Sequence, residues 1–175
     1  MESKVKAFGH PIHPMLIVFP LGLLATSLFF DIIHWITGNG FFSVVAFWMI
    51  TAGVIGALLA AIFGLIDWLA IPAGTRAKTL GLWHGVGNVV IVLLFIVSWL
   101  IRLNAQSNPN VFAYILSIVG VVLALFTGWL GGELVDRLGV GVDEGANLDA
   151  PSSLSRQPAT VTAKSTGQER GRATS

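Results

Sequence analysis

The sequence predicts an all-α membrane protein with four transmembrane helices, and three observations lead to this fold class. Its mean hydropathy is +0.80, and 54% of the 175 residues are hydrophobic whereas only 11% are charged. A soluble domain carries about a quarter charged residues. The apolar residues form four segments of about 20 residues, the length that crosses a bilayer core of about 30 Å. The segments are 15–36, 43–70, 82–103 and 111–132.

The first segment resembles a signal peptide only in the two lysines before it, Lys4 and Lys6. Its apolar run is too long for a signal peptide, it contains Asp31, and no small-residue cleavage site follows. We therefore expect it to be retained as the first transmembrane helix.

Turn-forming residues separate the four segments, and a polar tail follows the last one. Gly, Pro and Asn occupy the connections at 37–40, 71–74 and 104–110. From about Asp143 the chain has almost no large apolar residue and cannot bury enough surface to fold. The sequence thus divides into a membrane domain, 1–142, and a disordered tail, 143–175.

The basic residues predict the topology. Nine of the ten Lys and Arg residues fall at the N-terminus, in the second connection or after the fourth segment, and only Arg102 falls on the other side. Because Lys and Arg are enriched in cytoplasmic loops, both termini are expected in the cytoplasm.

Composition also excludes several functions. A net charge of +1 gives no electrostatic basis for binding nucleic acid. The chain has no cysteine, which excludes disulfides, Cys-ligated iron–sulfur clusters and covalently attached haem. Any metal or haem would rest on His, Met or carboxylate, and the lipid bilayer is the partner that composition implies.

The first and third segments share a spacing. His13 precedes Asp31 by eighteen residues, and His84 precedes Arg102 by eighteen. Eighteen residues are five helical turns, about 27 Å. A parallel repeat would bring Asp31 to Arg102 as a structural ion pair at the outer surface, and His13 to His84 at the inner surface.

Small residues recur every four positions along the second and fourth segments, which places them on one helix face and lets backbones approach closely. We expect these faces to pack within the bundle, with a homodimer seam as the alternative. They are Gly56, Ala60 and Gly64 in the second segment, and Gly120, Ala124, Gly128 and Gly132 in the fourth.

Two histidines lie where facing helices could share a cofactor. Ionisable side chains at a membrane helix are costly and are therefore candidates for function. His13 precedes the first segment and His84 opens the third. Four-helix bundles build cofactor sites from facing helices. His13 and His84 are thus candidate axial ligands of one non-covalent b-type haem, with Arg76 and Lys78 near its propionates.

A divalent-metal or iron site is an alternative, because imidazole and carboxylate suit zinc and iron. Pro11 and Pro14 are expected to hold the run 9–14 extended, so its two histidines would not form a helical ligand pair. A further alternative is that the histidines are structural and no cofactor binds. No nucleophile–base pair or nucleotide-binding motif indicates an enzyme. The candidate metal ligands are His10, His13, His84, Asp67 and Glu133.

Four motifs resemble the bacterial membrane family called domain of unknown function 2231. They are GHPIHPMLIVFPLGLLATSLFFD, GLIDW, LWHGVGN and GWLGGELVDRLGVGV, and the resemblance extends from about Phe8 to Val142. It implies a four-helix inner-membrane protein. The family is similar to b-type haem four-helix cytochromes, and some relatives are fused to Rieske-type redox domains. No residue role is implied by the resemblance.

Together these observations favour electron transfer through one haem near the cytoplasmic face, in exchange with a redox partner protein. The rival hypothesis is a non-redox membrane or transporter accessory subunit. A cytochrome needs two inward imidazoles at the same depth, whereas an accessory subunit does not.

Overall fold

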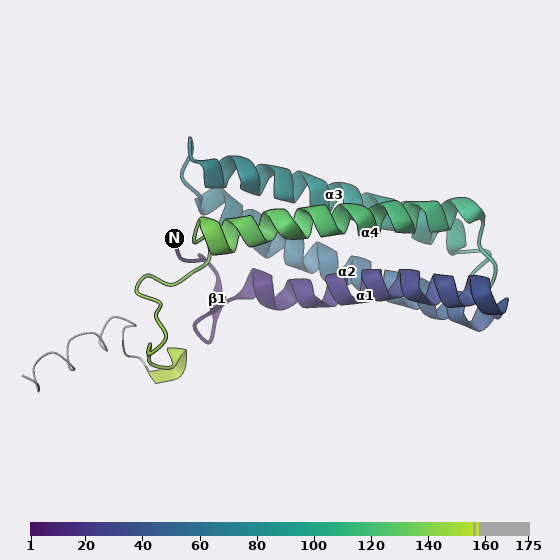
Figure 1. Cartoon of the computed structure of the whole chain (residues 1–175), viewed down its shortest axis with the longest axis horizontal. Helices are drawn as coiled ribbons and strands as arrows, with labels where there is room; N and C mark the ends of the chain where they lie inside the picture. The colour runs from purple at the N-terminus through teal and green to yellow at the C-terminus, as the bar shows by residue number, and fades with distance from the viewer. Residues whose placement is uncertain (156, 158–175) are drawn as a thin grey trace, which may run out of the picture.

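The computed structural model describes residues 1–155 and 157 and contains four long helices (Figure 1). They are α1 (Ile12–Thr37), α2 (Gly40–Ala70), α3 (Arg76–Arg102) and α4 (Val111–Gly132). Each helix is long and apolar enough to cross a membrane. The predicted all-α bundle of four apolar helices is thereby confirmed.

Capping residues explain where the helices begin. The Asn39 side chain accepts a hydrogen bond from Phe41 N at 3.0 Å and starts α2. The Thr75 hydroxyl accepts one from Lys78 N at 3.2 Å, so α3 begins at Arg76, six residues before the predicted segment. Only two residues connect α1 to α2, and Gly38 there adopts φ +67°, which favours glycine.

The start of α1 corrects one expectation. The run 9–14 was expected to be extended, but only its first part is. His10 and Pro11 form strand β2 (His10–Pro11), and α1 begins at Ile12. Pro14 therefore lies in the first helical turn, where the missing N–H costs no hydrogen bond. His13 is consequently a helical residue.

The bundle consists of two helical hairpins, α1–α2 and α3–α4, which start at the same end (Figure 1). Their buried core includes Leu24 and Ile50 from the first hairpin and Ile91 and Phe95 from the second. Most other large apolar side chains of the helices remain exposed, as lipid contact requires.

The two hairpins are structural repeats. Phe95 follows Leu24 by 71 residues, and Gly120 follows Gly53 by 67. A Cβ on Gly53 would lie 2.6 Å from Leu24 Cδ2, and a Cβ on Gly120 would lie 2.7 Å from Phe95 Cε2. The same contact, a large side chain against a glycine, thus recurs in both hairpins. Between the hairpins, α1 contacts α4 and α2 contacts α3, which is the pattern of a parallel repeat with an approximate two-fold axis along the bundle.

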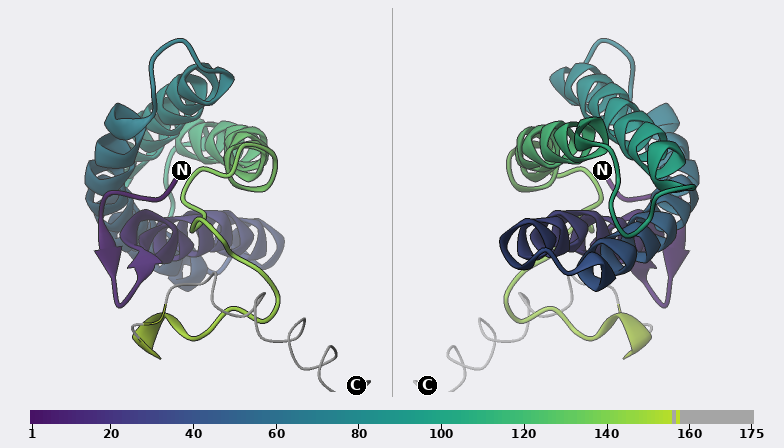
Figure 2. Two further views of the ribbon diagram at one scale, coloured as in Figure 1. Left: turned by 90° about the vertical axis from the view of Figure 1, so that its left-hand side faces the viewer. Right: turned by 90° about the vertical axis from the view of Figure 1, so that its right-hand side faces the viewer.

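The start of the chain folds across the end of the bundle where α1 and α3 begin (Figure 2). Strand β1 (Lys6–Ala7) pairs with β2 in a small antiparallel hairpin. After α4 come a π-helix, η1 (Glu133–Arg137), and a 3₁₀ turn, η2 (Ser153–Ser155). We call this end of the bundle the terminal end and the other the distal end.

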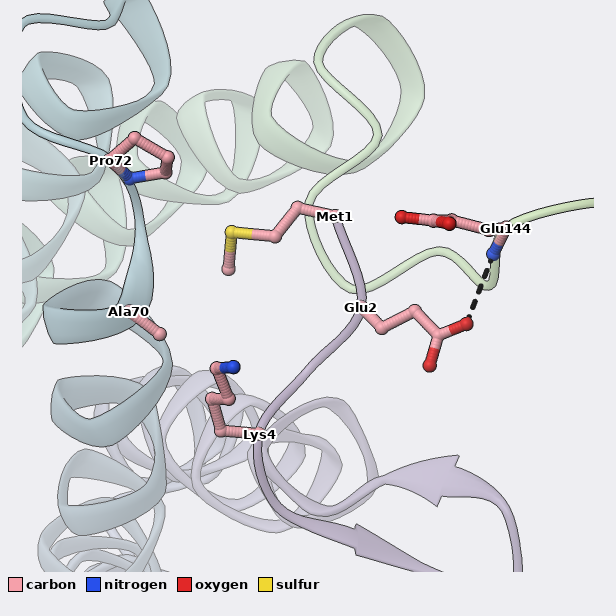
Figure 3. Close-up of a pocket in the computed structure, with 6 residues that line it drawn as sticks. All are labelled: Met1, Glu2, Lys4, Ala70, Pro72 and Glu144. Carbon is pink, nitrogen blue, oxygen red and sulfur yellow. Dashed lines mark hydrogen bonds between the residues drawn. The ribbon is translucent and has the colours of Figure 1, made fainter.

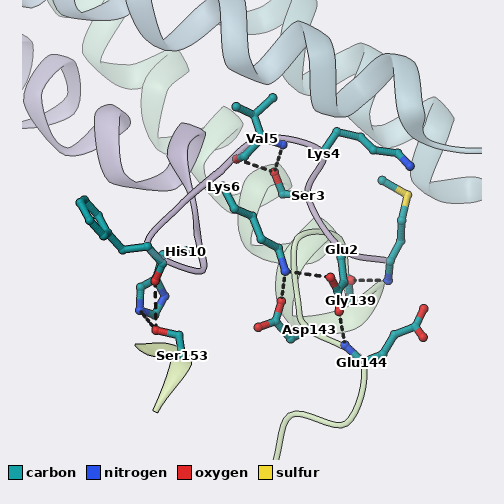
Figure 4. Close-up of polar contacts among 12 residues, drawn as sticks. Glu2, Ser3, Lys4, Val5, Lys6, His10, Gly139, Asp143, Glu144 and Ser153 are labelled. Atoms are coloured by element: carbon teal, nitrogen blue, oxygen red, sulfur yellow. Dashed lines mark hydrogen bonds and ion pairs between the residues drawn. The ribbon is translucent and has the colours of Figure 1, made fainter. Parts of the chain in front are cut away.

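Residues 1–7 and 139–144 bind each other, and we call these two segments the terminal clamp (Figure 4). Lys6 Nζ pairs with Glu2 at 2.8 Å and also with Asp143. The Met1 ammonium donates to Gly139 O at 3.0 Å. Part of the predicted tail therefore lies against the N-terminus, while residues 156 and 158–175 of that tail lie outside the described residues.

An open hollow of about 520 Å³ lies between the terminal clamp and the end of α2 (Figure 3). The Met1 side chain points toward Ala70 and Pro72, and Glu2 accepts a hydrogen bond from Glu144 N at 3.2 Å. The clamp thus covers the terminal end without filling it.

Candidate functional site

His13 lies in the first turn of α1 and contacts α2 directly. Its Nδ1 is 2.9 Å from the backbone oxygen of Ala60. A carbonyl oxygen only accepts, so this contact assigns the ring proton to Nδ1 and leaves the Nε2 lone pair available. The ring lies against Gly64, where a Cβ would come within 2.8 Å of His13 Cε1.

His84 repeats this arrangement between α3 and α4. Its Nδ1 is 2.9 Å from the backbone oxygen of Thr127, and its ring lies against Gly131, where a Cβ would come within 3.1 Å of Cε1. Nε2 of His84 is 3.2 Å from the amide nitrogen of Asn88, which also donates to His84 O at 2.8 Å.

The histidines occupy equivalent positions of the repeat. His84 follows His13 by 71 residues, the offset between the first helices of the two hairpins. Thr127 follows Ala60, and Gly131 follows Gly64, by 67 residues, the offset between the second helices. The structure therefore forms a pair of anchored imidazoles across the approximate two-fold axis.

The two halves differ in polarity. On the His84 side, Asn88 Oδ1 accepts a weak hydrogen bond from the Thr127 hydroxyl at 3.4 Å. The equivalent positions on the His13 side are Ile17 and Ala60, which have no polar side-chain atom. His84 is therefore held by a polar network and His13 by one carbonyl.

The two basic residues predicted near the haem propionates have different surroundings. Arg76 is 62% exposed and pairs with Glu133 at 3.0 Å. Lys78 donates to the backbone oxygen of Trp68 at 2.8 Å and lies 4.0 Å from the centroid of that indole. Lys78 thus satisfies the last carbonyls of α2, while Arg76 stays at the surface.

The residues of the alternative metal site are not gathered at one point. His10 is exposed beside Ser153. Asp67 accepts hydrogen bonds from the Ser3 hydroxyl at 2.7 and 2.8 Å, and Glu133 pairs with Arg76. Within residues 1–155 and 157, no group of three or more His, Asp or Glu side chains could hold a metal ion. The metal site stays a prediction.

A second polar centre lies at the distal end. Arg102 donates to both carboxylate oxygens of Asp31, at 2.8 and 2.7 Å, and both side chains are fully buried. Two serines near Arg102, Ser98 and Ser117, and the ring of Tyr114 surround the guanidinium. His34 contacts Asn39 O through Nδ1 at 3.0 Å.

Sequence reasoning missed the residues that anchor both centres. Thr127, Gly131, Ser98 and Ser117 were not identified as partners. Comparing the second segment with the fourth at an offset of 67 residues would have matched Gly64 with Gly131 and thereby indicated the two ring contacts.

Comparison with known proteins identifies a family but no function. The sequence model of the family described as Predicted membrane protein (DUF2231) matches residues 9–144. No curated protein and no solved structure matches the chain.

Proposed function

We propose that this chain, which belongs to the DUF2231 family of predicted membrane proteins, is a multi-pass electron-transfer protein of the bacterial inner membrane that holds one b-type haem. His13 and His84 are the residues that would hold its iron. One observation carries the proposal: both rings are anchored through Nδ1 to a backbone carbonyl of the neighbouring helix.

The donor set fits a haem iron. A ligating histidine commonly donates its other ring N–H to a carbonyl, which fixes the tautomer and the ring orientation. His13 and His84 both meet this requirement, and they come from different hairpins. A haem bound there would supply one-electron redox chemistry.

The surrounding residues orient the two rings. The carbonyls of Ala60 and Thr127 hold the Nδ1 protons, and Gly64 and Gly131 leave room for each ring against the helix backbone. The amide nitrogen of Asn88 lies 3.2 Å from Nε2 of His84. The Asn88 side chain would therefore have to turn away for that ring nitrogen to bind iron. Arg76 is exposed, and turning toward a propionate at the surface would exchange its ion pair with Glu133 for one with the haem.

A second candidate function is that of a non-redox membrane or transporter accessory subunit with structural histidines. The observation that favours it is the Asn88 contact, because it supplies Nε2 of His84 with a hydrogen-bond donor without any cofactor. In this function the histidines only join the helices within each hairpin.

Absorption spectra test the proposal. The protein is expressed with haem supply, purified in detergent, and measured oxidised and reduced. We expect a Soret band that His13→Ala and His84→Ala each abolish and that His10→Ala, an exposed control, preserves. Size-exclusion profiles of the variants show whether each one folds.

A colourless wild-type protein that is folded would contradict haem binding and leave the accessory function. Metal analysis of that same sample tests the alternative site. An unchanged spectrum in His84→Ala would contradict the ligand assignment even if haem is present.

A further inference from the structure

The Asp31–Arg102 pair joins the two hairpins inside the membrane domain. Asp31 comes from α1 and Arg102 from α3, and neither side chain has any exposed surface. Each donated hydrogen bond goes to a different carboxylate oxygen, at 2.8 and 2.7 Å. This two-point geometry is specific for guanidinium and carboxylate.

The groups that support the guanidinium all come from its own hairpin. Arg102 Nε is 3.3 Å from the Ser98 hydroxyl, and its Nη2 is 3.5 Å from that of Ser117. The Tyr114 ring centroid lies 4.8 Å from the guanidinium carbon. The α3–α4 hairpin thus carries a buried cation with polar and aromatic partners of its own, and the α1–α2 hairpin supplies the matching anion.

Asp31 and Arg102 also occupy equivalent positions of the repeat, 71 residues apart. Equivalent residues touch each other only close to the two-fold axis, because everywhere else the symmetry separates them. If two α1–α2 hairpins from different chains paired in the same way, Asp31 would meet a second Asp31. Two α3–α4 hairpins would likewise bring Arg102 against Arg102.

Apolar packing between the hairpins brings Leu24 and Ile50 together with Ile91 and Phe95. Such burial is not directional and depends mainly on apolar area, so it discriminates less sharply among these pairings than charge does. A like-charge contact in a buried site is strongly unfavourable, because neither charge is compensated. The charges therefore provide a repulsive element that separates correct from incorrect partners.

We infer that the Asp31–Arg102 pair determines hairpin pairing: it makes the face of the α1–α2 hairpin bind an α3–α4 hairpin and reject a second copy of itself. This inference does not depend on haem binding. It gives the pair a role in partner choice in addition to any contribution to stability.

Charge exchange in the full chain tests the inference. Asp31→Arg and Arg102→Asp each place like charges at the axis, and we expect both to lose the cooperative melting transition and the wild-type elution position in detergent. The double variant Asp31→Arg/Arg102→Asp restores opposite charges at equivalent positions. We expect it to recover most of both properties, and a double variant no better than the single variants would overturn the inference.

A neutral pair separates partner choice from stability. Asp31→Leu/Arg102→Leu removes both charges and keeps an apolar contact, so it is expected to fold. Light scattering should then show a larger share of dimers and higher species than the wild-type protein forms under the same conditions. An elution profile and mass identical to those of the wild-type protein would show that the charges do not select the partner.

Discussion

At the scale of single residues, the two ring–glycine contacts are the features that position the candidate site. Each histidine reaches its carbonyl only because the glycine four residues further along the facing helix has no side chain. His13 reaches Ala60 past Gly64, and His84 reaches Thr127 past Gly131. These glycines are therefore site residues, although they carry no chemistry.

Gly64→Ala should destabilise the protein. The added methyl group would lie 2.8 Å from His13 Cε1, so the ring has to move and its hydrogen bond to Ala60 O is lost. We expect a cost of about 1–3 kcal/mol in unfolding free energy, measured in mild detergent with increasing denaturant.

Two other helical glycines serve as controls for that measurement. Gly22 and Gly85 have no atom within 4 Å of an added Cβ, so Gly22→Ala and Gly85→Ala should be neutral or slightly stabilising. Equal losses in all three variants would show that the ring contact does not matter.

The side chains of the candidate site could be predicted only in part. The eighteen-residue spacing indicated His13, His84, Asp31 and Arg102, because charged and imidazole groups stand out against an apolar background. Their partners are backbone oxygens and glycines, which have no distinctive side chain. Periodicity alone does not show which carbonyl a ring reaches.

At the scale of elements, the helices were predictable and the terminal clamp was not. Long apolar runs fixed the helices to within a few residues, and the largest difference, at the start of α3, comes from the Thr75 cap. The clamp pairs Lys6 with Asp143, residues 137 positions apart. No local pattern encodes such a contact between two polar segments.

The terminal clamp should depend on pH. The Lys6 ammonium lowers the pKa of Glu2, and the Asp143 and Glu2 carboxylates raise the pKa of Lys6. A lowered Glu2 pKa contributes stability above its ordinary value of 4.5, and this is lost as pH falls. A raised Lys6 pKa contributes stability below its ordinary value of 10.5, and this is lost as pH rises through the folded-state pKa.

The clamp is therefore expected to protect backbone amides of residues 1–7 from hydrogen exchange between about pH 5 and pH 10. Protection should fall below pH 4, and added salt should weaken it because the ions are partly exposed. Lys6→Met removes both ion pairs, so its protection should be low throughout this range. Protection in Lys6→Met equal to that of the wild-type chain would contradict the expectation.

At the scale of the whole molecule, the repeat is the main feature that sequence reasoning only partly detected. In the first and third helices the repeat was visible in the sequence, because His13 and Asp31 have the same spacing as His84 and Arg102. In the second and fourth it was not, because their equivalent residues are small or apolar and the offset is 67 rather than 71. Glycine stripes at a spacing of four look alike in several registers, so they do not define the alignment.

The predicted topology places both termini in the cytoplasm, and the lack of cysteine makes it simple to test. Single cysteines are introduced at two exposed loop positions, Ala73→Cys between α2 and α3 and Asn108→Cys between α3 and α4. In intact spheroplasts, an impermeant maleimide should label only Asn108→Cys, and Ala73→Cys should react after lysis. Labelling of Ala73→Cys alone in intact spheroplasts would contradict the predicted topology.

The buried ion pair also bears on how the chain evolved. A symmetric dimer encoded by one hairpin carries the same residue at both copies of an axial position. Opposite charges at positions 31 and 102 require two separately encoded copies of the hairpin. If the halves arose from one hairpin, its duplication therefore preceded the pair that now distinguishes them.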